Sequence, residues 1–309
     1  MKSVRLAGIS VDVDSVSSHL EGYGFPRPDD DGAAYSRAIP RALDVFAATG
    51  THATFFLIAN EASRYPDVVQ DIHRRGHEVA SHSMTHRLPF AGLDDEALDV
   101  EVRQSKELLE RLVGASVTGF RAPSWELSDR LWAAIGSAGY TYDASTYPSI
   151  LLPLLRRSIA RRGANGRTRT ESSLWAGVFG PARPHVRALR DRSVAEIPVC
   201  TTPWTRLPYY HTLRFLLPGP AFACLGLLAR TRRCAVTYQF HAVDFLETDV
   251  DGLDERIRRH PGMSLPLQAK LDLATRSLRE LSARRQLVPL ARVAETASAH
   301  TSRALRTRR

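Results

Sequence analysis

Short apolar runs alternate with amphipathic helical patterns along the first two-thirds of this chain, and this alternation limits the possible folds more than any other feature. Apolar runs typical of strands cover 4–13, 52–58, 78–81, 117–121 and 141–144, and later ones cover 195–199, 234–240 and 287–290. Patterns typical of helices lie at 35–48, 61–75, 94–113 and 128–138, and a long one lies at 266–284. Repeated strand–helix units predict parallel strands in a barrel or an open α/β sheet.

The chain length and composition are those of a globular protein with one sizeable core. The 309 residues are 43% hydrophobic and 24% charged, which excludes a disordered chain. There is no internal repeat and no low-complexity linker. We therefore predict a single domain over 1–309, with an insertion near 150–192.

Positive charge is concentrated in two places within a net charge of +9. The segment 155–192 holds ten arginines and two acids, and the tail 302–309 is also basic. Such segments attract phosphate groups of nucleic acid, anionic lipid or a phosphorylated substrate, or they simply keep a surface soluble. Because no recognisable nucleic-acid-binding module accompanies the charge, we expect no nucleic acid partner.

The cysteines and the amino-terminal residues bear on the cellular compartment. Cys200, Cys224 and Cys234 are odd in number and lack paired metal-binding spacing, which fits a reducing environment better than a disulfide framework. The first residues run directly into a strand pattern, without the apolar core and cleavage site of a signal peptide. These features lead us to expect a cytoplasmic protein.

Two carboxylates end the first predicted strand, in the segment Ser-Val-Asp-Val-Asp-Ser. Side chains alternate between the faces of a strand, so Asp12 and Asp14 are expected to project together. Two carboxylates on one face are costly unless a positive group lies between or above them. Alone, this pair fits a solvated strand end with a turn-forming Asp better than a functional site.

Two histidines follow the predicted strand at 78–81, in the segment His-Ser-Met-Thr-His. The spacing of four places His82 and His86 on one side of a helical turn, a common way to supply two nitrogens to Zn²⁺. Both should lie at the same rim of the sheet as Asp14. Two histidines and one carboxylate form an open site, in which water or substrate completes the coordination.

Three further strand ends carry polar residues. Arg121 lies in Gly-Phe-Arg-Ala-Pro-Ser-Trp and could hold a catalytic carboxylate ionised and oriented. Asp143 ends the next predicted strand, and His241 follows the apolar run at 234–240. A histidine beside a carboxylate is a usual general acid. Five polar strand ends on one edge of a parallel sheet indicate an active site.

Taken in order, these five segments resemble the motifs of the polysaccharide deacetylase family, also called the NodB-homology domain or carbohydrate esterase family four. The family motifs are Thr-Phe-Asp-Asp-Gly, His-Ser/Thr-x-x-His, Arg-x-Pro-Tyr, a strand-end Asp and a His after an apolar run. The match spans about 4–245. It implies a distorted (β/α)₇ barrel, a divalent metal, and hydrolysis of a non-peptide amide bond.

The resemblance also implies roles for the matching residues. Asp14, His82 and His86 would hold the metal, Asp12 would be the catalytic base, and Arg121 would orient Asp12. We expect Zn²⁺, although Co²⁺ and Ni²⁺ suit the same ligands.

The remaining implied roles concern the acid and the substrate. His241 would be the acid and Asp143 would tune it. Ser124 stands where the family usually has Tyr, which puts sugar stacking by that residue in doubt, and Trp125 could substitute for it. The spaced Asp-x-Asp pair resembles a branch of the family that acts on small amides, aminoarabinose lipids and some peptidoglycans.

Three functions follow as alternatives. The first is N-deacetylation of an N-acetylamino sugar, free, in a glycoside or linked to a lipid phosphate. The second is deformylation or cyclic-amide hydrolysis of a small substrate, and the third is binding without catalysis, which the intact acid and base disfavour. The charge-free stretch 215–229 is too short to span a bilayer and fits either a core helix or peripheral contact with an anionic membrane.

Overall fold

The computed structural model describes residues 4–29, 31–153, 175, 177–190 and 192–306, with the side chains from 300 onward left out. Its centre is a nine-stranded sheet in the order β6-β7-β5-β4-β3-β2-β1-β8, and β9 pairs with the start of β1. All strands are parallel except β6, which is antiparallel to β7. The strands are β1 Leu6–Val13, β2 Thr54–Leu57, β3 Glu78–Ser81, β4 Gly119–Phe120, β5 Tyr142–Asp143, β6 His185–Ala188, β7 Ser193–Glu196, β8 Val236–His241 and β9 Gln286–Val288.

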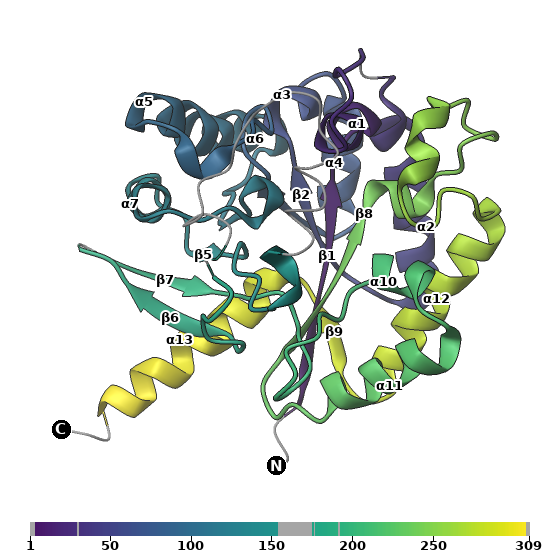
Figure 1. Ribbon diagram of the computed structural model, residues 1–309. Helices are drawn as coiled ribbons and strands as arrows, with labels where there is room; N and C mark the ends of the chain where they lie inside the picture. Colours follow the sequence, from purple (N-terminus) through teal and green to yellow (C-terminus); the bar gives the residue numbers. More distant parts are fainter. Residues whose placement is uncertain (1–3, 30, 154–174, 176, 191, 307–309) are drawn as a thin grey trace.

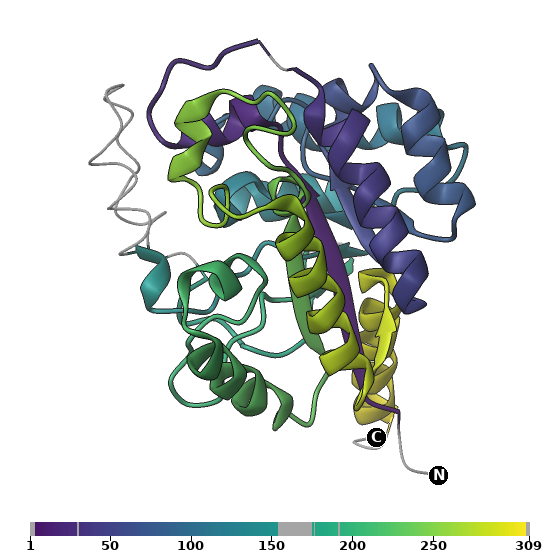
Figure 2. The ribbon, with the colours of Figure 1, turned by 90° about the vertical axis from the view of Figure 1, so that its right-hand side faces the viewer.

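The sheet curls into a half-barrel, which confirms the predicted distorted barrel of the NodB type (Figure 1). The α-helices are α1 Val16–Gly22, α2 Ile39–Thr49, α3 Ala59–Ala62, α4 Pro66–Arg74, α5 Asp95–Leu98, α6 Ser105–Val113, α7 Asp129–Ser137, α10 Thr212–Leu216, α11 Gly219–Arg230, α12 Leu267–Ser282 and α13 Leu290–Arg306. The π-helical segments are η1 Ala34–Ala38 and η3 Asp99–Gln104. The short 3₁₀ helices are η2 Phe90–Gly92, η4 Pro123–Trp125, η5 Ala242–Phe245 and η6 Glu255–Arg259. In Figure 2, α2 and α12 lie along the outer face of β1.

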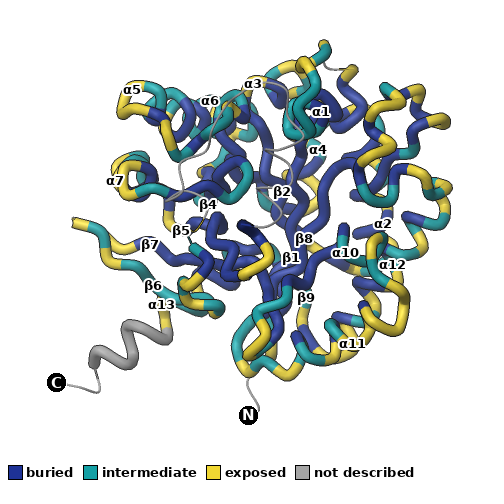
Figure 3. The backbone as a smooth tube through the Cα atoms, viewed as in Figure 1, coloured by how far each residue is buried: buried dark blue, intermediate teal, exposed yellow. Residues whose placement is uncertain are grey.

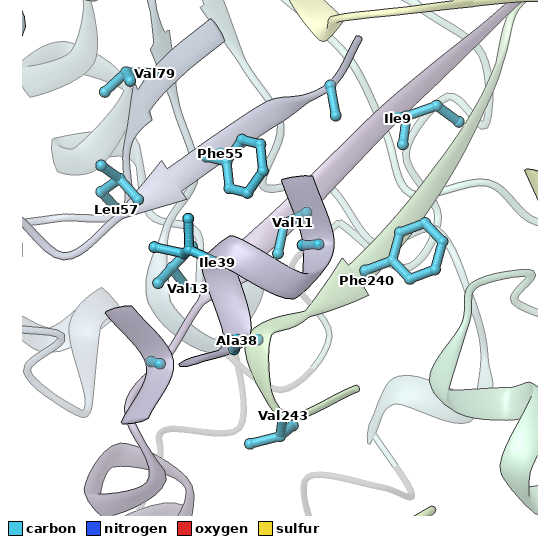
Figure 4. Close-up of a cluster of buried hydrophobic side chains, with 14 of the residues drawn as sticks. Ile9, Val11, Val13, Ala38, Ile39, Phe55, Leu57, Val79, Phe240 and Val243 are labelled. Carbon is cyan, nitrogen blue, oxygen red and sulfur yellow. The ribbon is translucent and has the colours of Figure 1, made fainter. Parts of the chain in front are cut away.

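The outer face of the sheet is apolar because odd-numbered side chains of β1 point toward the helices. Ile9, Val11 and Val13 are fully buried there and pack with Phe55 and Ile39 (Figure 4). Burial follows this layering, with dark blue strands inside and exposed helix surfaces outside (Figure 3). The apolar side chains of these strands lose their contact with water, which is the main stabilisation of the fold.

The inner face of the sheet differs between the two ends of β1. At the amino-terminal end of β1, Gly8 lets α13 approach closely: an added Cβ would lie 2.5 Å from Leu290 and 3.0 Å from Val293. At the carboxyl-terminal end, the same face carries Ser10 and Asp12. The inner face is therefore closed by a helix at one end and presents polar side chains at the other.

The predicted helix at 94–113 begins and ends where expected, but it is not uniform. Asp94 caps its start by accepting a hydrogen bond from the backbone N–H of Ala97 at 2.8 Å. Gly114 ends it in the left-handed conformation at φ 71°. Between α5 and α6, η3 is a π-helical segment. The helix predicted at 266–284 is confirmed as α12.

Several predictions concern residues that are described only in part. The insertion predicted at 150–192 lies mostly outside the described residues, apart from segments that include β6. The predicted basic tail at 302–309 continues the backbone of α13 as far as Arg306, and 307–309 lie outside the described residues. α13 itself was not predicted.

The charge-free stretch forms parts of α10 and α11, which pack against the protein by one face. Phe222 and Ala229 are buried, whereas Leu216 and Leu227 are exposed. In the part of the chain that the structure describes, no helix has both the length and the apolar character to span a membrane. Contact with an anionic membrane stays a prediction.

Candidate active site

The end of β1 brings two carboxylates to one rim of the sheet, as the alternation predicts. Asp12 is the penultimate residue of β1 and Asp14 follows its end, and both are buried. Ser15 then caps α1, accepting a hydrogen bond from the backbone N–H of Ser18 at 3.2 Å. The chain therefore turns directly after Asp14, which remains at the rim.

Asp14 lies against the two predicted metal-binding histidines. Its Oδ1 is 3.2 Å from Nε2 of His82 and 3.4 Å from Nε2 of His86. These ligand atoms lie within 4.8 Å of one another, and all three residues are buried. Oδ1 of Asp14 makes no hydrogen bond of normal geometry within the described residues. The ligand atoms of these three residues thus lie close together, and Oδ1 of Asp14 remains without a hydrogen-bond partner among them.

The backbone sets the tautomer of His82. Its Nδ1 lies 2.8 Å from the carbonyl oxygen of Arg121, so Nδ1–H donates and Nε2 faces Asp14. Burial acts to lower the pKa of His82, but Asp14 outweighs it and raises this pKa, so a bound cation would displace a proton from Nε2. Burial lowers the pKa of His86 to about 3, which leaves that imidazole neutral. Burial also acts to raise the pKa of Asp14, but His86 and His82 outweigh it and hold this pKa well below the usual range. A carboxylate and neutral imidazoles are the forms that bind a cation.

The prediction of a helical turn at 82–86 is wrong, although the two histidines do meet. The segment is an irregular loop, with positive φ values of 72° at Ser83 and 59° at His86. Buried Glu101 holds the loop by accepting hydrogen bonds from the backbone N–H groups of Met84 and Thr85 at 3.0 and 2.9 Å. Loop hydrogen bonds, rather than helical periodicity, place the imidazoles 5.1 Å apart by ring centroid.

Asp12 is held at both carboxylate oxygens. Oδ1 accepts a hydrogen bond from Nη1 of Arg121, and Oδ2 accepts one from Nε2 of Gln239 at 2.6 Å. The buried guanidinium of Arg121 also donates to Ser10 Oγ and lies 4.1 Å from the ring of Phe56. The structure therefore brings Arg121 to Asp12, as the motif implies.

His241 lies beside Asp12 on the neighbouring strand. The two residues are paired in the parallel register of β1 and β8. Nδ1 of His241 is 3.2 Å from Oγ1 of Thr212, and Nε2 is 3.3 Å from Nε2 of Gln239. Gln239 thus contacts both the predicted base and the predicted acid.

The predicted contact of Asp143 with His241 requires correction. The hydrogen bonds of Asp143 go to the backbone N–H and hydroxyl of Ser145, at 2.8 and 2.6 Å, and within the described chain no hydrogen bond joins it to His241. Ser145 in turn accepts a hydrogen bond from the N–H of Ala122 at 2.8 Å, next to Arg121. Burial raises the pKa of Asp143 to about 7. Asp143 braces the segment that carries Arg121.

The two predicted substrate-binding residues lie in η4 with positive φ values of 53° each. The ring of Trp125 is 5.1 Å from that of Tyr147 and 6.2 Å from that of His241. Trp125 is therefore next to the predicted acid, as a pocket wall would be. Ser124 precedes it in the same turn.

Sequence reasoning missed several residues at the site, among them Gln239, His19 and His260. Gln239 could have been found, because it precedes His241 by two residues and so shares its face of β8. His19 could have been suspected because it follows Asp14 by five residues, and its Nε2 lies 4.0 Å from Oδ2 of Asp14. His260 follows η6, far away in the sequence, and no local pattern marks it.

The residues present fit a divalent metal. The donors are one carboxylate oxygen and two imidazole nitrogens, with the tautomer of His82 set by a backbone carbonyl and an unpaired Oδ1 on Asp14. The metal prediction is thus consistent with the geometry, and the identity of the ion stays a prediction.

Comparisons with known proteins agree with the fold and with the resemblance to the polysaccharide deacetylase family. The model of the polysaccharide deacetylase family matches residues 30–142. The chain is 32% identical over 144 residues to a peptidoglycan deacetylase of Helicobacter pylori, covering 45% of this chain and 49% of that protein. It is 35% identical over 101 residues to a chitooligosaccharide deacetylase of Sinorhizobium fredii, covering 32% of this chain and 46% of that one.

The chain spans about half the length of these curated relatives. A solved structure from Mycobacterium smegmatis, assigned as a polysaccharide deacetylase, aligns with a TM-score of 0.62 at 19% identity, over 97% of this chain and 93% of that one. That structure supports the fold. These matches show that residues 30–142 are similar to the polysaccharide deacetylase family, and that the fold of the chain is similar to that of a solved structure assigned to it.

Proposed function

We propose that this protein is a metal-dependent hydrolase that removes the acetyl group from an N-acetylamino sugar. The observation that carries the proposal is the arrangement at one rim of the sheet. The cluster of Asp14, His82 and His86 lies beside Asp12, which is paired in register with His241. The named activities of the curated relatives, on peptidoglycan and chitooligosaccharide, support an acetylated amino sugar as the substrate class.

A divalent cation, which we propose to be Zn²⁺, would be held by Asp14, His82 and His86 and would supply Lewis acidity toward the amide carbonyl and the attacking water. Asp12 accepts the proton of that water, and its two held oxygens keep the carboxylate oriented. As the water oxygen bonds to the carbonyl carbon, charge develops on the carbonyl oxygen. His241 then gives a proton to the leaving nitrogen as the C–N bond breaks, which releases acetate and the free amine.

The experiment uses the full chain, stripped of metal and reloaded with Zn²⁺, Co²⁺ or Ni²⁺. Metal content is measured by mass spectrometry, and acetate and formate release are measured on N-acetylated and N-formylated amino sugars, free and oligomeric. Asp14→Ala and His82→Ala should lose both the metal and the activity. Asp12→Asn should keep the metal and lose roughly 10²- to 10⁴-fold in turnover.

A matched control is Asp44→Asn. The side chain of Asp44 lies on α2, outside the site, and is 76% exposed. This substitution should change neither metal content nor rate. Wild-type turnover in metal-loaded Asp12→Asn would remove Asp12 as the base. Release of formate without acetate would replace the deacetylase proposal with a deformylase.

A further inference from the structure

Three histidine rings, those of His19, His241 and His260, lie close together in a triangle beside Asp14. The ring of His19 lies 4.7 Å from that of His260 and 6.1 Å from that of His241, and the last two are 6.4 Å apart. Asp14 approaches the metal-site histidines through Oδ1 and His19 through Oδ2. The triangle therefore adjoins the proposed metal without being part of its ligand set.

Two imidazole nitrogens in this triangle have no partner. Nε2 of His19 and Nε2 of His260 are buried and make no hydrogen bond within the described chain. The distance of 4.0 Å from His19 to Asp14 is too long for one. Leaving a buried donor or acceptor unpaired costs roughly 1–3 kcal/mol. A polar group brought by a ligand would remove that cost.

His260 is oriented by a contact on its other nitrogen. Its Nδ1 lies 3.0 Å from the hydroxyl of Tyr23 in the segment after α1, and the residue is only 8% exposed. The ring is thereby fixed, so Nε2 has a defined direction beside His19. A preformed, buried and unpartnered nitrogen is the arrangement expected of a binding group rather than of a residue that only packs.

The surrounding charges indicate the kind of group that would bind. Burial holds the pKa of His260 well below its usual range, so its imidazole is neutral near pH 7. The carboxylate of Asp14 beside His19 disfavours an anion. A hydroxyl group is uncharged and can both donate and accept, so it suits two buried imidazole nitrogens that have no hydrogen-bond partner.

We propose that His19 and His260 form a subsite that binds a hydroxyl group of the sugar whose acetamido group lies at Asp14, His82 and His86. This inference rests on the proposed function, because the hydroxyl belongs to the sugar whose amide that function places at Asp14, His82 and His86. The subsite would favour hydroxylated substrates over simple acetamides, since only the former satisfy both Nε2 atoms.

The test compares two acetamides with the metal-loaded full chain. One is an N-acetylglucosamine oligosaccharide, and the other is para-nitroacetanilide, which carries no hydroxyl. His19→Phe and His260→Phe keep an aromatic ring and remove its nitrogens, and His260→Asn restores a polar group. The control is His52→Asn, because His52 is exposed and precedes β2 at the opposite end of the sheet from the site.

The ratio of kcat/KM for the oligosaccharide to that for the anilide should fall roughly 10- to 100-fold in the phenylalanine variants, mainly through KM, and recover partly in His260→Asn. Metal content should stay at one ion per chain. The control should leave both substrates unaffected. Equal losses on both substrates, or loss of the metal, would overturn the inference while the deacetylase proposal stood.

A measurement of oligosaccharide binding distinguishes failure of the inference from failure of the proposed function. If the wild-type protein releases no acetate from either substrate, the proposed function fails. Calorimetry with the same oligosaccharide then decides the subsite. Affinity that falls in His260→Phe and not in His52→Asn supports it, and affinity unchanged in both overturns it.

Discussion

Replacing Arg121 by Met tests how the site and the fold depend on one buried ion pair. The guanidinium is 2% exposed and donates to Asp12 Oδ1, to Ser10 Oγ at 3.1 Å and to the carbonyl oxygen of Ala144 at 3.1 Å. Methionine fills much of the volume but leaves the carboxylate of Asp12 buried with Gln239 as its remaining partner. Removing one partner of a buried pair costs about 3–5 kcal/mol.

A double-mutant cycle separates the stability cost of Arg121→Met into a part due to charge and a part due to packing. In an Asp12→Asn background the remaining side chain is neutral, so Arg121→Met should cost less there than in the wild type. We expect a coupling free energy of more than about 1.5 kcal/mol between the two changes. Arg121→Lys keeps the charge but cannot make the fork of hydrogen bonds, and it should fall between wild type and Arg121→Met.

The assay is urea unfolding of the metal-free full chain, followed by the fluorescence of its four tryptophans. The control is Arg130→Met on α7, where the side chain is 66% exposed and its nearest carboxylate, on Asp95, is 3.9 Å away. That change should cost less than about 1 kcal/mol. Single costs that add to the double cost within about 0.5 kcal/mol would refute the dependence of Asp12 on Arg121.

Three further changes test other parts of the site. Glu101→Gln should weaken metal binding roughly 10- to 100-fold, measured by competition with a chelator, because it loosens the loop that carries the two metal-site histidines; unchanged affinity would exclude this support. Gln239→Leu should keep the metal and lower kcat more than it raises KM, because Asp12 loses the donor at Oδ2; an unchanged kcat would exclude a positioning role. Burial raises the pKa of Asp143 to about 7. The folded protein therefore keeps a proton on Asp143 that the unfolded chain loses above about pH 4. As a result, Asp143 makes the free energy of unfolding fall as the pH rises from about 4 to 7. Asp143→Asn should flatten that fall in urea unfolding measured across this range, and an unaltered slope would show that other groups cause it.

The sequence predicts the strands of this site well because two local patterns mark them: a short apolar run, and side chains that alternate between the two faces. The strand predicted at 78–81 is β3, and the apolar run at 4–13 contains β1 with its alternating faces. Since both are parallel strands, their polar ends meet at one rim, as expected. The structure brings Asp14, His82 and His86 together at that rim, as their position after parallel strands of one sheet predicts, although the helical spacing assumed for the two histidines is wrong.

The errors arise where long-range contacts decide the geometry. The loop at 82–86 is shaped by Glu101, which lies in a different element, so a rule for helical spacing could not describe it. Asp143 ends a strand as predicted, but its near neighbour Ser145 takes its hydrogen bonds. His260 reaches the site through the packing of η6 against α1, which leaves no periodic signal in the sequence.

The pairing of Asp12 with His241 across β1 and β8 has a consequence for how this site can change. Neighbouring strands are about 4.7–4.9 Å apart because backbone hydrogen bonds hold them there. The separation of the proposed base and acid is thus a property of the sheet and not of the loops that follow it. Loops such as the one that carries Trp125 can vary in length or sequence and admit a different amine, while proton removal and proton delivery keep the same spacing.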